Sequence, residues 1–538
     1  MKSAEIIMQC LKKENVRVVF GYPGATVIPI YEALRKSDIE HVLVRQEQAA
    51  GHAASGYARA TGKVGVCIVT SGPGASNIIT GIAAAYMDSI PMVVITGQVK
   101  SSLIGRDVFQ ELDITGAAES FTKYNFLVKK AEYIPKIMKE AFYIARTGRK
   151  GPVLIDIPVD IMDEDIDDFE YPQTVDIRGY KPTTEGHVGQ IRKIVDRIKN
   201  SRRPIICAGG GVILSNAEKQ LREFVEKSHI PVVNTLMGKG AMNEDSNYYI
   251  GFIGTHGFDY ANRAVESADV LILIGSRASD RTTCGIGSRF AAEADIIHID
   301  IDPAEIDKNL NADIPVVGDI KIILEKLSRM ICPLDTEKWI YKIKEWSENS
   351  DPDENSTEKV NPKIILNKIS DLLENDVILT ADVGQNQIWC ARNFKILGDR
   401  KFFTSGGLGT MGYSIPAAIG AKIGCPDKRV VAFVGDGGFQ MSMFELGTIL
   451  EKRINIIIVL LNNSGLGLVR EIQRNNHFEE FEVNFEANPD FVKLAGAYGL
   501  LARRVENNVE FKKAFQEALY SDKTFLIECI VDPLENTF

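Results

Sequence analysis

Long hydrophobic runs are missing from this sequence. No apolar stretch approaches the roughly 18 residues of a membrane-spanning helix, so we expect nothing in the chain to cross a membrane. The N-terminal stretch MKSAEIIMQCLKKENVRVVFGYPG places apolar residues at helical spacing and then a strand, without the unbroken apolar core and cleavage site of a signal peptide. We therefore expect the protein to work in the cytoplasm.

Cysteine is scarce and scattered. The chain has eight cysteines, and no two of them form a CxxC pair or a spacing typical of metal ligands. This distribution argues against a disulfide framework and against a zinc site. We expect the cysteines to be packing residues in a reducing compartment.

An excess of basic charge is also missing. Lysine and arginine number 62 against 72 aspartates and glutamates, which gives a net charge of -10 and a pI near 5.5. Nucleic acids and anionic membranes both require a basic face, so neither is expected as a partner. Any anion that the protein binds must be held by local geometry.

The chain does have length and regularly alternating elements. Its 538 residues, 45% of them hydrophobic and 25% charged, exceed what one hydrophobic core supports. Two polar segments, residues 161–187 and 347–362, are typical of linkers. In the three blocks that remain, Val/Ile-rich runs alternate with amphipathic stretches, as in parallel sheets covered by helices on both faces. The sequence therefore predicts an α/β protein with three doubly wound parallel-sheet domains, over 1–165, 186–335 and 361–538.

The first and third blocks share a pattern. Residues 64–97 are predicted to form a strand, the turn SGPG, a helix and a second strand. Residues 429–463 repeat this order with GDGG in place of SGPG, and their second strand ends at Asn462-Asn463. We therefore expect two related domains on either side of a different one.

Polar residues end two apolar strands of the third block, at GDGG (435–438) and at Asn462-Asn463. Ligands of parallel sheets bind beyond the carboxyl ends of the strands, where glycines allow close approach and a helix N-terminus attracts an anion. The Asp436 carboxylate, the Asn463 amide oxygen and a carbonyl from NNSG would suit Mg²⁺, with phosphate oxygens completing the octahedron. The alternative is structural: Asp436 caps a helix and the asparagines form a turn. The two motifs together, joined by one helix and one strand, favour a metal diphosphate site.

This pair of motifs is the signature of thiamine diphosphate enzymes, and the whole chain resembles the large catalytic subunits of the acetolactate synthase family. The resemblance extends to stretches in all three blocks. GDGG with NN alone indicates only the superfamily, whereas DVFQE and GGLGTMG point to this family. The matching stretches are GYPGATVIPIYEAL, RQEQAAGHAASGYARATGKVGV, TSGPGASNIITGIAAAYMDSIPMVVITGQV, DVFQELDI, RKGPVLIDIPVDI, HIDIDPAEI, GGLGTMGYSIPAAIGAK and GDGGFQ with LLNN.

The resemblance implies a fold, a reaction and an assembly. The first block would bind the pyrimidine ring of the cofactor, the third its diphosphate, and the middle block would be FAD-binding-like. The family decarboxylates pyruvate on thiamine diphosphate and condenses the product with a second 2-keto acid, mainly pyruvate here, to give 2-acetolactate for branched-chain amino acid biosynthesis. The cofactor would lie between the first domain of one subunit and the third domain of another. A homodimer is then the minimum active unit, with a tetramer and a small regulatory subunit left open.

The family's cofactor residues are carried over position by position. Glu47 matches the glutamate that bonds the aminopyrimidine ring and stabilises its imino tautomer. Gly409 and Met411 match the backbone acceptor and the apolar wedge that bend the cofactor. The Mg²⁺ ligands implied are Asp436, Asn463 and Gly465. The other thiamine diphosphate positions implied are Gly384, Gln385, Asn386, Gly437, Gly438 and Leu466.

Other positions match residues that contact the substrates. Gln110 and Phe109, in DVFQE, match residues that line the substrate pocket, and Gln110 is the expected hydrogen-bond partner of the reacting species. Arg281, in ASDRTT, matches an arginine that holds the carboxylate of the acceptor. Ile472 stands where the family has a tryptophan that packs on the acceptor, and Lys123 matches a polar family position.

A dinucleotide site is not indicated by the middle block alone. Its stretches AGGGVILS and GTHGFDYAN both miss the GxGxxG spacing. The family nevertheless binds FAD in a non-redox role. The positions that match its FAD contacts are Arg149, Gly210, Gly211, His256, Gly275, Arg277, Asp300, Ile301 and Asp319.

The chain departs from the family pattern at five places. The residues expected to support the cofactor chemistry are intact, whereas acceptor choice and FAD affinity are left open. The departures are Gln46 for a histidine, Gly24-Ala25-Thr26 for GGA, Val159 for a lysine, Ser279-Asp280 for an aspartate pair and Ile472 for a tryptophan.

Other thiamine diphosphate enzymes share this architecture. Pyruvate oxidase, keto-acid decarboxylase and sulfoacetaldehyde acetyltransferase are alternatives that product analysis would separate. A glyoxylate carboligase is disfavoured because that family lacks the glutamate present here as Glu47. A non-catalytic nucleotide-binding protein is the alternative from another class, and intact Glu47 and Asp436 argue against it.

Overall fold

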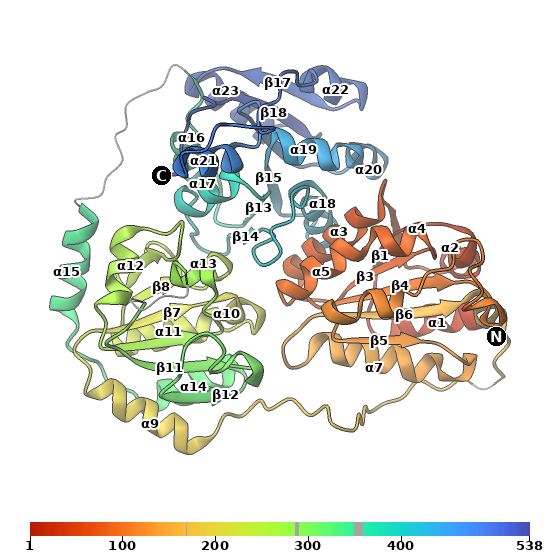
Figure 1. Cartoon of the computed structure of the whole chain (residues 1–538), viewed down its shortest axis with the longest axis horizontal. Coiled ribbons are helices and arrows are strands. Elements are labelled where there is room, and N and C mark those ends of the chain that lie inside the picture. Colours follow the sequence, from red (N-terminus) through yellow and green to blue (C-terminus); the bar gives the residue numbers. More distant parts are fainter. Residues whose placement is uncertain (168, 286–289, 349–358) are drawn as a thin grey trace. The chain divides into compact units, whose positions relative to one another are not determined.

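The structure is a computed structural model that describes all residues except 168, 286–289 and 349–358. The described part contains three six-stranded sheets with helices packed on them (Figure 1), one within each block expected from the sequence. This confirms the predicted α/β class with three parallel sheets. Most of the expected linker at 347–362 lies outside the described residues.

The chain divides into two compact units. The first unit contains the first sheet and most of the third, and the second unit contains the middle sheet together with Lys401 and Phe402 from an edge strand of the third. The three domain boundaries expected from the sequence stay a prediction. The first unit comprises Met1–Tyr180, Val377–Asn386 and Phe403–Leu534, and the second Lys181–Asp376, Gln387–Phe402 and Glu535–Phe538.

The first sheet has the strand order β2-β1-β3-β4-β6-β5, and its strands pair in parallel. Helices α1, α2, α7 and α8 bury apolar side chains against one face, and α3 packs on β1 and β3. The strands are β1 Val18–Tyr22, β2 Glu40–Leu43, β3 Gly65–Val69, β4 Met92–Gln98, β5 Tyr124–Leu127 and β6 Pro152–Pro158. The helices are α1 Ser3–Lys13, η1 Ala25–Val27, α2 Ile28–Arg35, α3 Glu47–Thr61, α4 Pro73–Asn77, α5 Ile79–Met87, η2 Ser101–Leu103, α6 Ile114–Ala117, η3 Glu119–Phe121, η4 Ala131–Tyr133, α7 Ile134–Arg146 and α8 Val159–Asp163.

The third sheet repeats this topology, with the order β14-β13-β15-β16-β18-β17. The internal likeness read from the sequence therefore corresponds to one strand order used twice. The strands are β13 Val377–Ala381, β14 Lys401–Phe403, β15 Arg429–Gly435, β16 Ile457–Asn462, β17 Leu501–Val505 and β18 Phe525–Ile530. The helices are α16 Pro362–Leu372, α17 Gln385–Asn393, α18 Ser414–Gly424, α19 Asp436–Ser442, η7 Met443–Glu445, α20 Leu446–Lys452, α21 Gly467–Asn475, α22 Phe491–Ala497 and α23 Asn508–Leu519.

The middle sheet has a different order, β12-β11-β10-β7-β8-β9. When it is followed from β9, this is the 3-2-1-4-5-6 order of doubly wound nucleotide-binding folds. Side chains of α9, α11 and α14 cover one face, and those of α12 and α15 cover the other. The strands are β7 Pro204–Ala208, β8 Val232–Asn234, β9 Tyr249–Phe252, β10 Val270–Ile274, β11 Asp295–Asp300 and β12 Ile314–Val317. The helices are α9 Val188–Lys199, α10 Gly210–Leu214, α11 Glu218–Ser228, η5 Leu236–Gly238, α12 Asp259–Glu266, α13 Asp280–Thr283, η6 Pro303–Glu305, α14 Ile320–Met330 and α15 Glu337–Glu348.

Within the first unit, α3 and α18 pack backbone against backbone. A Cβ built on Gly56 would lie 2.0 Å from the carbonyl oxygen of Ala417, and one on Gly420 would lie 1.8 Å from that of Ala53. Only glycine allows this approach, which explains the small-residue run AAGHAASG in α3. The contact ties the helix that begins at Glu47 to the third sheet.

Two further expectations concern cysteine and membranes. All eight cysteines are free. Among the described residues, no helix has the length and apolar character needed to cross a membrane.

Candidate cofactor site

Three neighbouring strands of the third sheet place the predicted diphosphate residues at one edge. Strands β13, β15 and β16 are adjacent and parallel, so their carboxyl ends meet. Gly384 follows β13, Asp436 follows β15 and Asn463 follows β16. The predicted residues therefore gather at the edge of the sheet where ligands of parallel sheets bind.

Asp436 is the buried carboxylate of the site. It is the first residue of α19 and is 1% exposed. Its Oδ2 accepts the Gly465 N–H at 3.1 Å and the Asn488 Nδ2 at 2.9 Å. Burial raises the pKa of Asp436 to about 6, although these hydrogen bonds lower it. Because a cation would offset the cost of burying the charge, the position fits a metal ligand.

Asn463 and Gly465 supply neutral oxygen atoms next to this carboxylate. The Asn463 Nδ2 donates to Gln385 Oε1 at 2.9 Å, and its backbone carbonyl accepts from Arg470 at 3.3 Å. The Gly465 carbonyl accepts the Gly467 N–H at 3.0 Å and keeps a second lone pair.

The described residues contain no group of three or more His, Cys, Asp or Glu side chains able to hold a metal. One carboxylate with neutral oxygens is a donor set that leaves room for phosphate oxygens, as Mg²⁺ diphosphate requires. These residues fit the group that the sequence predicted.

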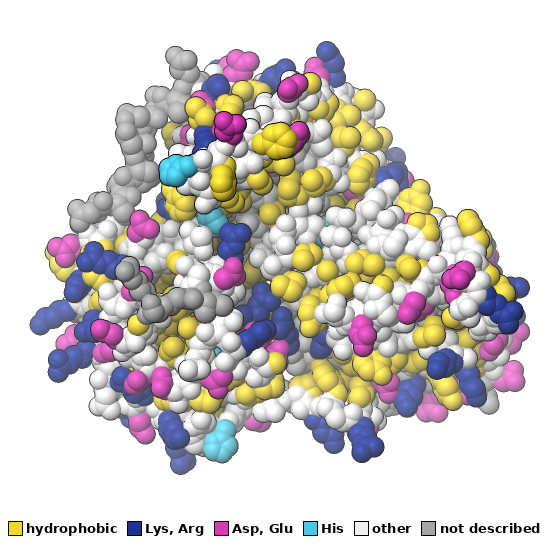
Figure 2. Space-filling model, in the orientation of Figure 1, with side chains coloured by type: hydrophobic (Ala, Val, Ile, Leu, Met, Phe, Trp, Pro, Cys, Tyr) yellow, Lys and Arg dark blue, Asp and Glu magenta, His cyan; other side chains and the backbone are white. Residues whose placement is uncertain are grey.

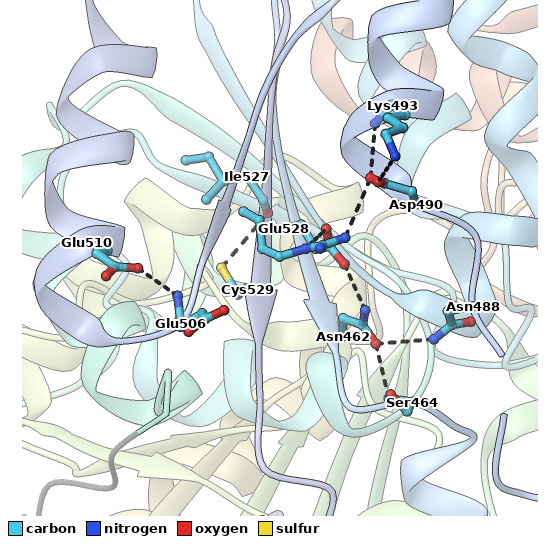
Figure 3. Close-up of polar contacts among 11 residues, drawn as sticks. Asn462, Ser464, Asn488, Asp490, Lys493, Glu506, Glu510, Ile527, Glu528 and Cys529 are labelled. Atoms are coloured by element: carbon cyan, nitrogen blue, oxygen red, sulfur yellow. Dashed lines mark hydrogen bonds and ion pairs between the residues drawn. The ribbon is translucent and has the colours of Figure 1, made fainter. Parts of the chain in front are cut away.

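A network of polar side chains centres on Asn462 (Figure 3). Asn462 Nδ2 donates to Glu528 at 2.9 Å, and its Oδ1 accepts the Ser464 N–H at 3.1 Å and Asn488 Nδ2 at 3.2 Å. Asn488 is the same side chain that bonds to Asp436. The first asparagine of the NN motif is therefore linked to Asp436 through Asn488.

Apolar side chains lie beside Gly437, the second glycine of GDGG. A Cβ on Gly437 would meet Leu466 Cδ2 at 3.0 Å, Met411 Cε at 3.3 Å and Phe485 Cζ at 3.5 Å. The structure thus brings Met411 and Leu466, both expected from the sequence, to the same place. Gly409, in the same loop as Met411, adopts a φ of 76°, in the left-handed region that glycine favours.

Two buried aspartates that sequence reasoning missed hold the GGLGTMG loop. Asp382, directly after β13, accepts the N–H groups of Gly412 and Ser414 at 2.9 Å, and burial raises its pKa to about 6. Asp88 accepts the Gly407 N–H at 2.7 Å and pairs with Arg59 at 2.8 Å. A polar residue ending an apolar strand was the signal that found Asp436, and it would also have found Asp382. Asp88 carried no such signal.

Glu47 is the first residue of α3 and is 9% exposed. Its carboxylate accepts Asn77 Nδ2 at 2.9 Å, and a Cβ on Gly74 would lie 3.4 Å from it. The SGPG turn therefore lies beside the glutamate. Thr26, a departure from the family pattern, has a hydrogen-bond partner here, since its hydroxyl oxygen lies 2.9 Å from that of Thr70.

Comparison with known proteins assigns the family. Models of thiamine pyrophosphate enzymes match the chain as the N-terminal TPP binding domain at 1–117, the central domain at 191–327 and the C-terminal TPP binding domain at 382–529. The probable acetolactate synthase large subunit of Methanocaldococcus jannaschii is 48% identical over 99% of this chain and 93% of its own length. That of Methanococcus aeolicus is 46% identical over 99% and 92%. Isozyme 3 of the Escherichia coli acetolactate synthase large subunit is 40% identical over 100% and 96%.

This chain belongs to the family of acetolactate synthase large subunits. The resemblance seen in the sequence is thereby confirmed, and thiamine diphosphate, the same molecule as thiamine pyrophosphate, is the cofactor of its two TPP binding domains. The roles of individual residues stay predictions.

The family's substrate loop, between β4 and α6, carries Phe109 and Gln110. The Phe109 ring is 87% exposed, and Gln110 has a φ of 60°. A Cβ on Gly72, in the SGPG turn, would lie 3.0 Å from Gln110 Cα, so this loop contacts the turn beside the glutamate of α3. The carboxylate of Glu111 accepts backbone N–H groups within 105–108 and so stabilises the tip of the loop.

A buried pair fastens the end of the same loop to the sheet. Gln98 Nε2 donates to Asp156 at 2.9 Å and to the Leu112 carbonyl at 2.8 Å, and the Thr96 hydroxyl donates to Asp156 at 2.6 Å. Desolvation raises the pKa of Asp156 to about 7. Sequence reasoning did not single out this pair, because both residues lie within apolar strands.

The remaining substrate positions of the family are placed as follows. Lys123 donates to the Thr147 carbonyl at 2.7 Å and so caps the end of α7. Arg281 lies on α13 in the second unit with its side chain exposed, and its carbonyl accepts the Thr255 N–H at 2.8 Å. Ile472 lies on α21 and is 48% exposed.

Glycines of the expected FAD site meet in the middle sheet. Gly210 and Gly211 follow β7, and Gly275 follows the neighbouring strand β10. A Cβ on Gly211 would lie 2.7 Å from Gly275 Cα, and Gly275 has a φ of 58°. Strands β7 and β10 are where the strand order reverses, which is where doubly wound sheets bind nucleotides.

The other positions expected at the FAD site are spread over the second unit, except for one. Asp300 ends β11, Asp319 is the N-cap of α14, and the His256 ring stacks on Phe538 at 6.0 Å between ring centroids. Arg149 belongs to the first unit, where its Nε donates to the Ser89 hydroxyl. Ile301 follows Asp300, and Arg277 follows β10 with its carbonyl bonded to Asn309.

Proposed function

We propose that this protein is an acetolactate synthase, which decarboxylates pyruvate and joins the two-carbon product to a second 2-keto acid, mainly pyruvate. The observation that carries the proposal is the combination of a buried Glu47 with the Asp436 and Asn463 strand ends, in a chain whose relatives with that activity in their names match it end to end. The product would supply branched-chain amino acid synthesis.

The residues of the site would divide the work. Bound thiamine diphosphate supplies the acidic carbon and the electron sink that decarboxylation of a 2-keto acid requires. Asp436, Asn463 and the Gly465 carbonyl would hold Mg²⁺ against its diphosphate. Glu47 would hold a proton at the aminopyrimidine ring, and Gln110 would donate a hydrogen bond to the reacting acid.

The proposed assembly is at least a homodimer, with each cofactor between Glu47 of one subunit and Asp436 of the other. Exposed apolar side chains support it, since Leu408, Met441 and Leu450 are 44%, 51% and 52% exposed. Figure 2 shows hydrophobic side chains over α19 and α20, the helices that carry two of them. The relatives are named large subunits, so a small regulatory subunit is a further proposed partner.

FAD is proposed as a second, structural cofactor of the middle sheet. The support is the contact of Gly211 with Gly275 at the point where the strand order reverses. The reaction has no net electron transfer, so chemical reduction of the flavin should leave acetolactate formation mostly intact. Bleaching of the flavin during anaerobic turnover would instead indicate an oxidase.

The acceptor preference is proposed to be weak. An isoleucine at 472 covers less of an acceptor than the family's tryptophan, and one methylene gains only about 0.8 kcal/mol when it is buried. With pyruvate and 2-ketobutyrate both present, acetolactate should be the main product. A strong bias to acetohydroxybutyrate would contradict this proposal.

The experiment that tests the activity is direct. Purified protein is incubated with pyruvate, thiamine diphosphate and Mg²⁺, and the products are separated. Acetolactate is expected. Acetyl phosphate with peroxide, or free acetaldehyde, would assign the protein to one of the other thiamine diphosphate enzymes.

A further inference from the structure

Three buried polar side chains form a hydrogen-bonded relay that ends at the proposed metal ligand Asn463. Asn463 Nδ2 donates to Gln385 Oε1 at 2.9 Å, and Gln385 Nε2 donates to the carboxylate of Glu471 at 2.8 Å. The three residues are 7%, 4% and 4% exposed. They come from the loop after β16, the start of α17 and the middle of α21.

The carboxylate of Glu471, at one end of this relay, fixes the order of donors and acceptors along it. An ionised carboxylate only accepts hydrogen bonds, so Gln385 must turn its NH₂ group to Glu471. Its carbonyl oxygen then faces Asn463, which must turn its own NH₂ group to Gln385. The Asn463 Oδ1 is consequently directed away from Gln385 and is available to a cation.

Packing leaves the three side chains little freedom to rearrange. A Cβ on Gly467 would lie 2.0 Å from Gln385 Oε1 and 2.3 Å from Asn463 Nδ2. The Asn463 backbone carbonyl is held separately by Arg470 at 3.3 Å. An amide can present either its oxygen or its nitrogen with almost the same shape, so packing alone does not choose between them.

We infer that Glu471 is a positioning residue for the metal site: through Gln385 it makes Asn463 present its oxygen, rather than its nitrogen, to Mg²⁺. The inference rests on the proposed function in one respect, namely that Asn463 is a Mg²⁺ ligand. Groups that orient metal ligands typically contribute about 10–100-fold to metal affinity.

Calorimetric titration of the full-length apoenzyme with Mg²⁺, at a fixed concentration of thiamine diphosphate, measures this contribution without reference to turnover. Glu471→Leu should weaken Mg²⁺ binding about 10–100-fold. Glu471→Gln allows the relay to run in either direction, so the apparent affinity should fall only about twofold if half of the molecules hold the correct orientation. Glu506→Leu, at an exposed carboxylate, is the matched control and should change nothing.

An exchange of the two side chains separates orientation from packing. In the double variant Gln385→Glu with Glu471→Gln, the carboxylate at 385 accepts from Asn463 and from the new amide, so Asn463 keeps its orientation. Gln385 is also an expected thiamine diphosphate position, so each of these variants is titrated at a cofactor concentration that saturates it. Mg²⁺ affinity should then return to within about threefold of wild type, whereas Gln385→Glu alone places two carboxylates face to face and should weaken it. The exchange conserves volume, so a variant that fails to fold is not expected to obscure the result.

A double-mutant cycle distinguishes this inference from the metal assignment itself. If Glu471 acts through Asn463, then Glu471→Leu combined with Asn463→Ala should bind Mg²⁺ no more weakly than Asn463→Ala alone. Additive losses, or unchanged affinity in Glu471→Leu, would overturn the relay. Unchanged affinity in Asn463→Ala would instead overturn the proposed metal site.

Discussion

Glu47 stands at the start of α3 with its carboxylate buried and bonded to Asn77. Glu47→Gln keeps the size of the side chain but removes its acidity. A positioned acid or base of this kind contributes about 10²–10⁴-fold, so turnover at saturating cofactor should fall by that factor. Initial rates of acetolactate formation test this, with thiamine diphosphate binding measured in parallel to confirm that the site is filled. Half of the activity retained would remove Glu47 from the mechanism.

Asp156 should give the protein a stability that depends on pH. Its pKa is raised from 3.8 to about 7 by burial. The folded state therefore holds the proton more tightly than the unfolded state, and this contribution to stability, present below pH 4, is lost as the pH rises to about 7. Asp156→Asn removes the titration, so the stability of the variant relative to wild type should rise with pH, by up to about 4 kcal/mol. Its thermal midpoint should rise relative to that of wild type in the same direction.

Thermal unfolding between pH 4.5 and 8 measures this difference. Asp160→Asn is the matched control, because the pKa of Asp160 is lowered by hydrogen bonds from Ser101. Asp160 therefore stabilises the fold above its ordinary pKa, and its variant should show no gain with rising pH. A difference in thermal midpoint between Asp156→Asn and wild type that does not change with pH would contradict the raised pKa of Asp156.

At the scale of elements, the start of α21 is set by one glycine. Gly467→Ala would place a Cβ 2.0 Å from Gln385 Oε1, so α21 or the start of α17 must move. Cofactor affinity should fall at least tenfold, because a shift of this size disturbs the oxygen ligands of Asn463 and Gly465. The measurement is a thiamine diphosphate titration at saturating Mg²⁺.

Gly496→Ala provides the control for that substitution. Gly496 lies in α22, and a Cβ there would meet nothing within 4 Å. Alanine in place of an open helical glycine stabilises by about 0.5–1 kcal/mol. This variant should keep its cofactor affinity and unfold at a slightly higher temperature. Equal cofactor affinities in the two variants would show that the packing around Gly467 does not affect the site.

At the scale of the whole molecule, the proposed shared site makes a prediction about mixtures. Glu47→Gln and Asp436→Ala should each be nearly inactive alone. Coexpressed, they should recover about a quarter of the wild-type activity, because half of the dimers are mixed and each mixed dimer has one intact site of two. No recovery would place both residues in a site formed by one chain.

Strand-end reasoning pointed to part of the candidate site. Asp436 and Asn463 were found because each follows an unbroken apolar strand, and the same rule applied to Asp382 would have added it. It could not find Glu471, which lies in the middle of an amphipathic helix, or Asp88, more than three hundred residues away from the Gly407 that it bonds. Neither residue has a local pattern, because its role is defined only by a partner distant in the sequence.

The sequence by itself determined three parallel sheets, the likeness of the first and third, and the carboxyl edge at which the cofactor residues gather. These follow from the period and composition of short segments, which local physics governs. Only the tertiary structure decided how the amides of Asn463 and Gln385 are oriented, which glycines have no room for a Cβ, and that α3 packs on α18. Those features depend on distances of a few ångströms between segments far apart in the chain, and no local pattern of residues records such distances.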